Sequence, residues 1–309
     1  MLSENKLTLN KIYKKMNGNH IMKILVIGDL HGQMPKIYFK EFDAIIAPGD
    51  FCLDTDIRKY SGLTYKEFLK NPMNYRSWWR IAGKRKAKKY VNKSLKYGRA
   101  ILEKLNAYNV PVYVIPGNWD FVFEDDEWTY LNKDLYKEYI IKGLKNVIDV
   151  HHKVMTIGKY TIIGYGLVQG PELLKYRHYK NIPKERYVRN IKRYNILKTK
   201  YAKLFVKAKK SKRAIIFLSH NVPFNTSLDK IVNKDSPMNG HHYGSNLTRD
   251  LILKYKPILN IGGHMHEHYG TCKLGSTTVL NAGYGGDKST LIELENEKIK
   301  SIKFHGKKR

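Results

Sequence analysis

Short apolar runs, each followed by a loop that contains Gly, Pro or Ser, recur along the chain. Five of these runs lie within residues 23–28, 42–50, 112–118, 214–220 and 258–264. Their length and their content of Ile, Leu and Val predict short strands. Because the runs are almost continuously apolar, both faces of these strands should be buried, as in an α/β fold.

Other patterns predict further elements. Six apolar residues recur at helical spacing and predict a helix whose apolar stripe packs on a sheet while its basic face stays in solvent. They are Tyr90, Val91, Leu95, Ile101, Leu102 and Leu105. Residues 160–164 are a further predicted strand, and residues 270–275, 277–281 and 291–294 alternate with turns and predict antiparallel strands. The turn at Asn281–Gly283 should close the strand at 277–281, since Asn and Gly both tolerate positive φ.

Polar side chains that bind divalent metals follow each of the five buried runs. They are Asp29 and His31, Asp50, Asn118, His220, and finally His264 and His266. In open α/β sheets, ligands bind at the edge where the strands end. A single Asp, Asn or His in a loop most often caps a helix or has a structural role. Seven donors at five strand ends favour a metal site instead, and this mixture of N and O donors suits Mn, Fe, Zn or Co better than Ca.

The motifs appear in the order Asp-x-His, Gly-Asp, Gly-Asn-x-Asp, Ser-His and Gly-His-x-His. They lie at Gly28–Gly32, Pro48–Asp50, Pro116–Asp120, Leu218–His220 and Gly262–Glu267. This order resembles the calcineurin-like metallophosphoesterase superfamily, and the resemblance extends from Lys23 to about Tyr284. It implies an α/β fold in which two mixed β-sheets pack face to face with helices outside them, as a four-layer sandwich. The length and the 42% apolar composition of the chain suffice for one large core and predict a single domain over residues 22–309.

The resemblance further implies two divalent metal ions, with Mn favoured. One ion would be held by Asp29, His31, Asp50 and His266, and the other by Asp50, Asn118, His220 and His264. Asp50 would then bridge the two ions. The activity implied is that of a dinuclear metal-dependent phosphoesterase, in which a metal-bridging hydroxide attacks the phosphorus of a phosphate ester. No covalent intermediate with the protein is needed.

One position departs from the pattern of many relatives, which carry a histidine where this chain has Trp119. Tryptophan has no titratable proton, so general-acid help worth about a hundredfold or more has to come from elsewhere. His241 and His242 are the candidates, and Asp120 is a weaker one. The other interpretation of these histidines is that they cap the following helix or line the substrate cleft, and the sequence leaves both open. Asn118 and Trp119 are predicted substrate contacts.

By the same resemblance, the missing histidine favours a phosphodiesterase, since some relatives also lack it and the family's diesterases tolerate aryl or nucleoside leaving groups. Two alternatives remain open. The first is a phosphomonoesterase that acts on a phosphoprotein or a metabolite. The second is a non-catalytic nucleic-acid-binding protein that keeps the fold, because a metal can also serve structure.

The charge of the chain is unusual and unevenly placed. Lys and Arg total 57 and Asp and Glu total 27, which gives a net charge of +30. Residues 58–104 hold 15 basic and 2 acidic side chains, and residues 171–213 hold 16 and 2. We interpret both segments as basic helical insertions at the rim of the site, which indicates an anionic substrate. In the second insertion, aromatic residues alternate with cations at 176–180 and 186–194, a composition that favours nucleotide or nucleic-acid binding. A general bias towards Lys with solvated helix faces is the alternative, but it does not explain why acids are scarce in these two segments.

The remaining features set limits. Residues 1–21 are polar and rich in Lys, and they predict an N-terminal extension, unless translation begins at Met22. No run of about 18 apolar residues is present, so no membrane span is expected. Cys52 and Cys272 lack a zinc-site spacing, which favours a reducing cytoplasm. Oligomeric state is not determined by the sequence.

Overall fold

The computed structural model describes residues 21–71, 74–122, 134–173, 184–236 and 238–306. The predicted N-terminal extension, apart from Ile21, lies outside the described residues. The aromatic and basic segment 176–180 also lies outside them, as does the side chain of Arg186.

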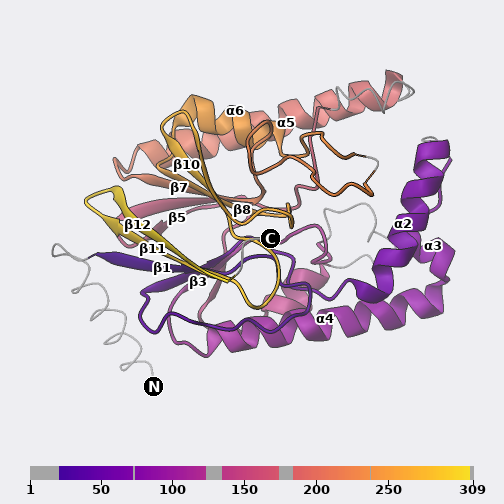
Figure 1. Cartoon of the computed structure of the whole chain (residues 1–309), viewed down its shortest axis with the longest axis horizontal. Coiled ribbons are helices and arrows are strands. Elements are labelled where there is room, and N and C mark those ends of the chain that lie inside the picture. Colours follow the sequence, from indigo (N-terminus) through magenta and orange to yellow (C-terminus); the bar gives the residue numbers. More distant parts are fainter. Residues whose placement is uncertain (1–20, 72–73, 123–133, 174–183, 237, 307–309) are drawn as a thin grey trace.

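Two six-stranded mixed sheets form the centre of the molecule (Figure 1). The first has the order β12-β11-β1-β2-β3-β4 and the second the order β5-β6-β7-β8-β10-β9. The strands of the first sheet are β1 (Met22–Val26), β2 (Ala44–Ala47), β3 (Val112–Val114), β4 (Val147–Asp149), β11 (Ser289–Glu295) and β12 (Lys298–His305). Those of the second are β5 (Val154–Ile157), β6 (Tyr160–Tyr165), β7 (Ile215–Asn221), β8 (Leu259–Gly263), β9 (Gly270–Leu274) and β10 (Thr277–Asn281).

The inner strands of both sheets run parallel, so their carboxyl ends meet at one edge. In the first sheet, β1 to β4 are parallel neighbours, with Ile24 opposite Ala44 and Ile45 opposite Val112. In the second, β6, β7, β8 and β10 are parallel, with Ile216 opposite Leu259. The five predicted buried runs therefore deliver their following loops to the same side of the molecule.

The inner faces of the sheets share one core. Val26 and Ile46 of the first sheet pack with Ile162, Leu218 and Ile261 of the second, and all five are fully buried. This is the face-to-face packing that the resemblance implies.

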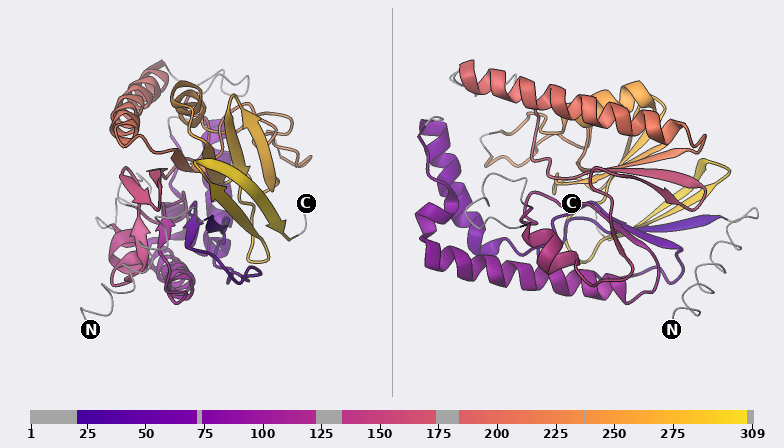
Figure 2. Two further views of the ribbon diagram at one scale, coloured as in Figure 1. Left: turned by 90° about the vertical axis from the view of Figure 1, so that its left-hand side faces the viewer. Right: turned by 180° about the vertical axis from the view of Figure 1, so that it is seen from behind.

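Helices cover the two outer faces (Figure 2). On the first sheet lies α4 (Lys84–Asn106), and on the second lie α5 (Lys184–Lys209) and α6 (Asn246–Tyr255), whereas α2 (Thr55–Lys70) and α3 (Trp78–Ala82) lie beyond the edge at which the inner strands end (Figure 1). The predicted amphipathic helix is α4, and Val91, Leu95, Ile101, Leu102 and Leu105 are all buried, whereas Tyr90 is only partly buried. The four-layer α/β sandwich is confirmed.

Three strands are not among the sequence predictions. β4 and β5 are short and partly exposed, and β12 is an edge strand in which Lys alternates with Ile, Ser and Phe. The structure also adds a π-helical turn over Tyr136–Ile141. Among the described residues, no helix is both long enough and apolar enough to cross a bilayer.

Candidate active site

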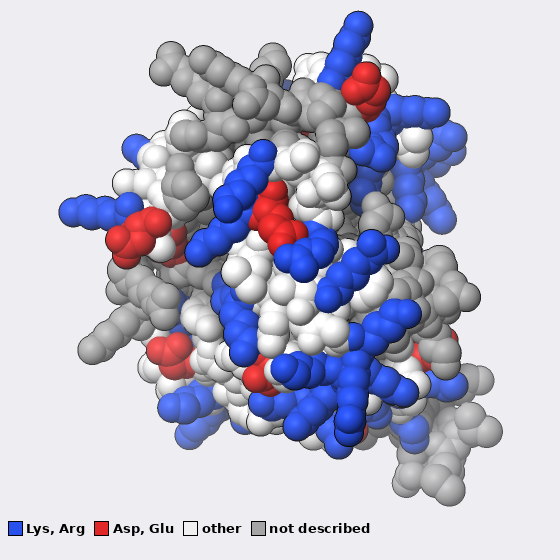
Figure 3. Space-filling model, turned by 90° about the vertical axis from the view of Figure 1, so that its right-hand side faces the viewer, with Lys and Arg blue, Asp and Glu red and all other residues white. Residues whose placement is uncertain are grey.

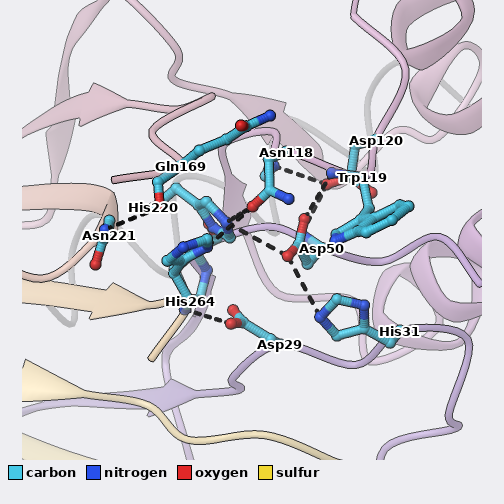
Figure 4. A network of polar contacts seen from close by, with 12 residues as sticks. Asp29, His31, Asp50, Asn118, Trp119, Asp120, Gln169, His220, Asn221 and His264 are labelled. Carbon is cyan, nitrogen blue, oxygen red and sulfur yellow. Dashed lines mark hydrogen bonds and ion pairs between the residues drawn. The ribbon is translucent and has the colours of Figure 1, made fainter. Parts of the chain in front are cut away.

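The predicted donor residues converge where the inner strands end (Figure 4). Ligand atoms of Asp29, His31, Asp50 and His266 lie within 4.8 Å of one another, and those of Asp50, His220 and His264 do so as well. Asp50 belongs to both groups. The seventh residue, Asn118, connects the histidines of the second group, because its Oδ1 lies 2.9 Å from His220 Nε2 and 2.9 Å from His264 Nδ1. We call these seven residues the donor cluster.

Asp50 lies at the centre of the donor cluster. Its Oδ2 is 3.3 Å from His31 Nε2 and 3.4 Å from His220 Nε2, while its Oδ1 accepts the Trp119 backbone N–H at 2.9 Å. Asp50 Oδ2 and Asp29 Oδ1 are buried and make no hydrogen bond among the described residues. A buried carboxylate oxygen without a donor is unfavourable unless a cation neutralises it. The donor cluster therefore fits two divalent ions that share Asp50.

Two of the imidazoles, those of His31 and His220, are oriented by a polar partner on the ring nitrogen that faces away from Asp50. His220 Nδ1 lies 2.9 Å from the Pro48 carbonyl oxygen and donates to it, which turns Nε2 towards Asp50. His31 Nδ1 lies 3.0 Å from Asp54 Oδ2, and its Nε2 also faces Asp50. A carboxylate or carbonyl on the far nitrogen is the usual partner of a metal-binding histidine, because it fixes the ring and its tautomer. Sequence reasoning missed Asp54, whose only signal was its position four residues after Asp50.

The charges of the donor cluster stabilise one another. Burial opposes ionisation of Asp50, but His220 and His31 outweigh it and hold the Asp50 pKa well below its usual range. Burial also opposes protonation of the two histidines, and Asp50 overcomes it, raising the pKa of His31 to about 10 and that of His220 to about 9. The pKa of His264 is instead lowered, by burial and by its neighbour His220. Cations are thus favoured around Asp50 whether they are protons or metal ions.

The backbone at the donor cluster adopts unusual conformations. His31, Asp50 and His264 have φ of 45°, 56° and 64°, in the left-handed region that non-glycine residues rarely occupy. Glycines beside the donors allow close approach, since a Cβ at Gly117 would lie 2.1 Å from Asp50 Oδ1 and one at Gly263 would lie 2.1 Å from Asp29 Oδ1. Such strain persists where surrounding structure enforces it, and it is concentrated at functional sites. The glycines of the motifs are therefore needed for the placement of the carboxylates.

Asp120 holds the loops around Asp50 together. Its carboxylate is fully buried and accepts the backbone N–H groups of Asp50, Phe51, Cys52 and Gly117, at 2.7, 2.9, 3.1 and 2.8 Å. Burial, and then the nearby Asp50, raise its pKa to about 6. With its oxygens occupied in this way, Asp120 is placed to position loops, and the sequence-based suggestion that it acts as an acid gains no support from its geometry.

Comparison with known proteins identifies the family. The model of the family described as calcineurin-like phosphoesterase matches residues 22–268. The chain belongs to this family. It is a metal-dependent phosphoester hydrolase, and this metallophosphoesterase family uses a dinuclear divalent metal centre.

Solved structures include one that supports the fold. This crystal structure aligns with a TM-score of 0.56 and 16% identity, over 93% of this chain and 100% of that chain. A second match is the protein TT1561 of Thermus thermophilus, with 15% identity and a TM-score of 0.47 over 94% of this chain and 100% of that chain. A third is a dimetal phosphatase from Danio rerio, with 10% identity and a TM-score of 0.48 over 92% of this chain and 96% of that chain. No curated protein matches the sequence.

Trp119, the position at which the sequence departs from the family pattern expected above, lies beside the donor cluster. Its indole lies under the guanidinium of Arg58, 5.6 Å from carbon to ring centre. Arg58 also forms an ion pair with Asp54, the residue behind His31. Sequence reasoning placed Arg58 only within a basic insertion and not at the site.

The two candidate acids lie on the segment that leads to α6. His242 Nδ1 lies 2.7 Å from Oδ1 of the buried Asp229, and about a third of the His242 side chain is exposed. The next residue, Tyr243, stacks on His264 with ring centres 6.3 Å apart. The helix cap is Ser245, whose Oγ accepts the Thr248 N–H at 3.0 Å, so the interpretation of these histidines as helix caps is wrong.

Proposed function

We propose that this calcineurin-like phosphoesterase is a phosphodiesterase that uses two divalent ions, with Mn favoured. Asp29, His31, Asp50 and His266 would hold one ion, and Asp50, Asn118, His220 and His264 the other. The observation that carries the proposal is that the two groups of donors share the buried carboxylate of Asp50. When bound, two such ions polarise a phosphoryl group and lower the pKa of a water molecule.

The residues around the ions would each have a distinct role. Asp50 stays ionised and balances charge, while the neutral amide of Asn118 offers an oxygen without adding negative charge next to a phosphate. Trp119 forms one side of the site. His242 is the better placed of the two candidate acids, because the buried carboxylate of Asp229 holds its Nδ1 and so fixes the orientation of the ring. His241 remains the second candidate.

Trp119 supports a diester rather than a monoester substrate. Without a proton donor at this position, the ester oxygen has to leave as an anion or receive its proton from a more distant group such as His242. Aryl diesters carry less negative charge than aryl monoesters and have equally good leaving groups, whereas a nucleoside alkoxide would need a proton from a group such as His242. Phosphomonoester hydrolysis is the alternative activity of the same donor cluster.

The surface supports an anionic substrate. Figure 3 shows the side of the molecule at which the inner strands end, and Lys and Arg side chains outnumber acids across it. They gather along the lower part of this view, where Figure 1 places α3 and α4. A positive rim raises the local concentration of nucleotides and nucleic acids, so we propose that the substrate belongs to these classes.

The decisive experiment is Mn-supplemented hydrolysis of bis-p-nitrophenyl phosphate beside p-nitrophenyl phosphate. Wild type should prefer the diester, and Asp50→Asn should lose at least about a hundredfold in rate, because both ions lose a shared ligand. Asp43→Asn is the matched control, since Asp43 precedes β2 at the opposite edge of the sheet, where its Oδ2 accepts the Lys23 backbone N–H at 2.8 Å. Preference for the monoester would favour the phosphatase. Two bound ions with no turnover of either compound would favour the non-catalytic nucleic-acid-binding protein.

A further inference from the structure

The amino-terminal half of α4 carries cations on one face. Residues 84–99 include eight Lys or Arg and no acid. A shallow hollow on the outer face of the helix is lined by Arg85, Lys88, Lys89, Asn92, Lys93 and Lys96, and all six are exposed. The opposite face is buried against the first sheet. At about 1.5 Å per residue this row of cations is about 16 Å long, which suits a polymer with several phosphates better than a single nucleotide.

This cationic row lies on the side of the molecule that holds the donor cluster. α4 leads into β3, whose amino end lies at the opposite edge, so the first turns of α4 extend towards the edge where the strands end (Figures 1 and 2). Lys93 Nζ pairs with Asp56 Oδ2 of α2 at 2.8 Å. Asp56 is two residues from Arg58, so the cationic row of α4 reaches the start of α2.

Arg58 continues the positive charge to the donor cluster. Its guanidinium lies over Trp119 and is anchored by the buried carboxylate of Asp54, while 55% of the side chain stays exposed. An arginine has five N–H donors, and the ion pair with Asp54 leaves others for a phosphate. The Trp119 backbone contacts Asp50, so an aromatic surface and a phosphate-binding group lie together beside the donor cluster.

We infer that α4, Arg58 and Trp119 form a track for single-stranded nucleic acid. One unpaired base packs against the part of the half-buried Trp119 indole that the core and Arg58 leave exposed, the adjacent phosphate binds Arg58, and the following phosphates lie along the cationic row of α4. Stacking on Trp119 requires a base that is free of its partner, which selects a single strand over a duplex. The inference rests on the proposed phosphodiesterase function, since the phosphate on the other side of this base, away from Arg58, is the one that lies at the donor cluster.

The test is binding of a fluorescently labelled 12-nucleotide single strand by anisotropy, in EDTA, so that neither metal nor turnover contributes. The variant Arg85→Gln/Lys88→Gln/Lys89→Gln should bind at least tenfold more weakly. Its slope of log K against log salt should fall by about 2, since each lost phosphate contact on a single strand contributes about 0.7. The matched control is Lys203→Gln/Lys207→Gln/Lys210→Gln, which removes the same charge from exposed positions that lead towards the start of β7, at the edge opposite the donor cluster. This control should stay within twofold of wild type.

Two further variants test the part of the track beside the donor cluster. Trp119→Leu and Arg58→Gln should each weaken binding of the single strand about fivefold or more, whereas Lys59→Gln, on the exposed side of the same turn of α2, should have little effect. Equal weakening by the α4 and control triple variants would overturn the track, and so would a duplex that binds as tightly as the single strand.

Hydrolysis of bis-p-nitrophenyl phosphate separates the two proposals. Turnover of this small diester by a protein that does not bind the single strand overturns the track and leaves the phosphodiesterase standing. Single-strand binding that follows the predicted variants supports the track on its own, and a simultaneous absence of turnover with Mn overturns the phosphodiesterase.

Discussion

At the scale of single residues, the buried carboxylate of Asp50 requires hydrogen-bond donors, cations and space, and the neighbouring residues provide them. A buried, ionised carboxylate in a left-handed conformation needs donors for one oxygen and cations for the other. The backbone of Trp119 supplies the donor, and the absence of a side chain at Gly117 makes room for the carboxylate. Asp120 accepts the backbone N–H groups of both Asp50 and Gly117 and so holds their two loops together.

Gly117→Ala should therefore disable the site. The new methyl group would lie 2.1 Å from Asp50 Oδ1 and would displace the carboxylate. Displacements of about 1 Å in a catalytic group reduce rates by about a hundredfold, so we expect that loss in diester hydrolysis together with reduced metal content. Gly62→Ala is the control, since nothing lies within 4 Å of a Cβ there and α2 should gain about 0.5–1 kcal/mol of stability. Equal metal content in both variants would contradict the account of Gly117.

Asp54→Asn should weaken metal binding without removing a ligand. The carboxylate lies 3.0 Å from His31 Nδ1 and keeps the other ring nitrogen facing Asp50. Loss of such a partner lowers metal affinity by about 10–100-fold, which competition with a chelator measures. Asp56→Asn removes a carboxylate two residues away that pairs with Lys93 at the surface, and it should leave the affinity within twofold. Similar affinities for the two variants would remove the assigned role of Asp54.

At the scale of elements, the sequence predicts the strands and helices whose apolar residues form a clear pattern within a short segment. The buried runs before the donors become β1, β2, β3, β7 and β8, and the helical stripe becomes α4. The missed strands β4, β5 and β12 are half exposed and have no strong apolar pattern, because their neighbours in the sheet define them. All seven donors could be identified because they lie at the carboxyl ends of strands or within a few residues after them. Asp54 behind His31 and Arg58 over Trp119 could not be, because these contacts depend on how α2 packs.

The packing of α5 on α6 should depend on pH through Asp250. Burial opposes ionisation of Asp250, but Lys198 and Tyr194 of α5 overcome it and lower its pKa; Lys198 Nζ lies 2.7 Å from Asp250 Oδ2. A carboxyl whose folded pKa is lowered stabilises the protein above its unfolded pKa of about 3.9, and this contribution is lost as pH falls through the folded value. Asp250→Asn should therefore lower stability by at most about 1 kcal/mol at pH 7, because the pair is partly exposed.

Thermal unfolding at two pH values measures this contribution. A loss of at most about 2 °C in Tm is expected at pH 7, and wild type and variant should converge as the pH falls through the lowered folded pKa of Asp250. Glu295→Gln, which removes a surface pair with Lys300 elsewhere, controls for the loss of one exposed charge. A difference that stays constant between the two pH values would mean that the carboxylate charge is not what joins α5 to α6.

At the scale of the whole molecule, the donor cluster joins the two sheets. Asp29, Asp50 and Asn118 follow strands of the first sheet, whereas His220 and His264 belong to the second. The sheets otherwise meet through an apolar core, which is insensitive to metal. The same convergence brings the start of α2 and the cationic row of α4 to the side where the donors lie, so the position of the charge follows from the parallel strand order.

Metal should therefore stabilise the fold as a whole rather than one loop. An ion that binds only the folded state at a hundred times its Kd adds about 2.7 kcal/mol, which for a chain of this size raises Tm by about 4 °C. Because the donors come from both sheets, the unfolding transition should stay single and move upward when Mn is added to chelator-treated protein. Asp50→Asn, which weakens both ion sites at once, should lose most of this shift, while Asp43→Asn should keep it. A second transition that alone responds to Mn would show that the ions hold only one sheet and its loops, and the donor cluster would then not act as a link between the layers.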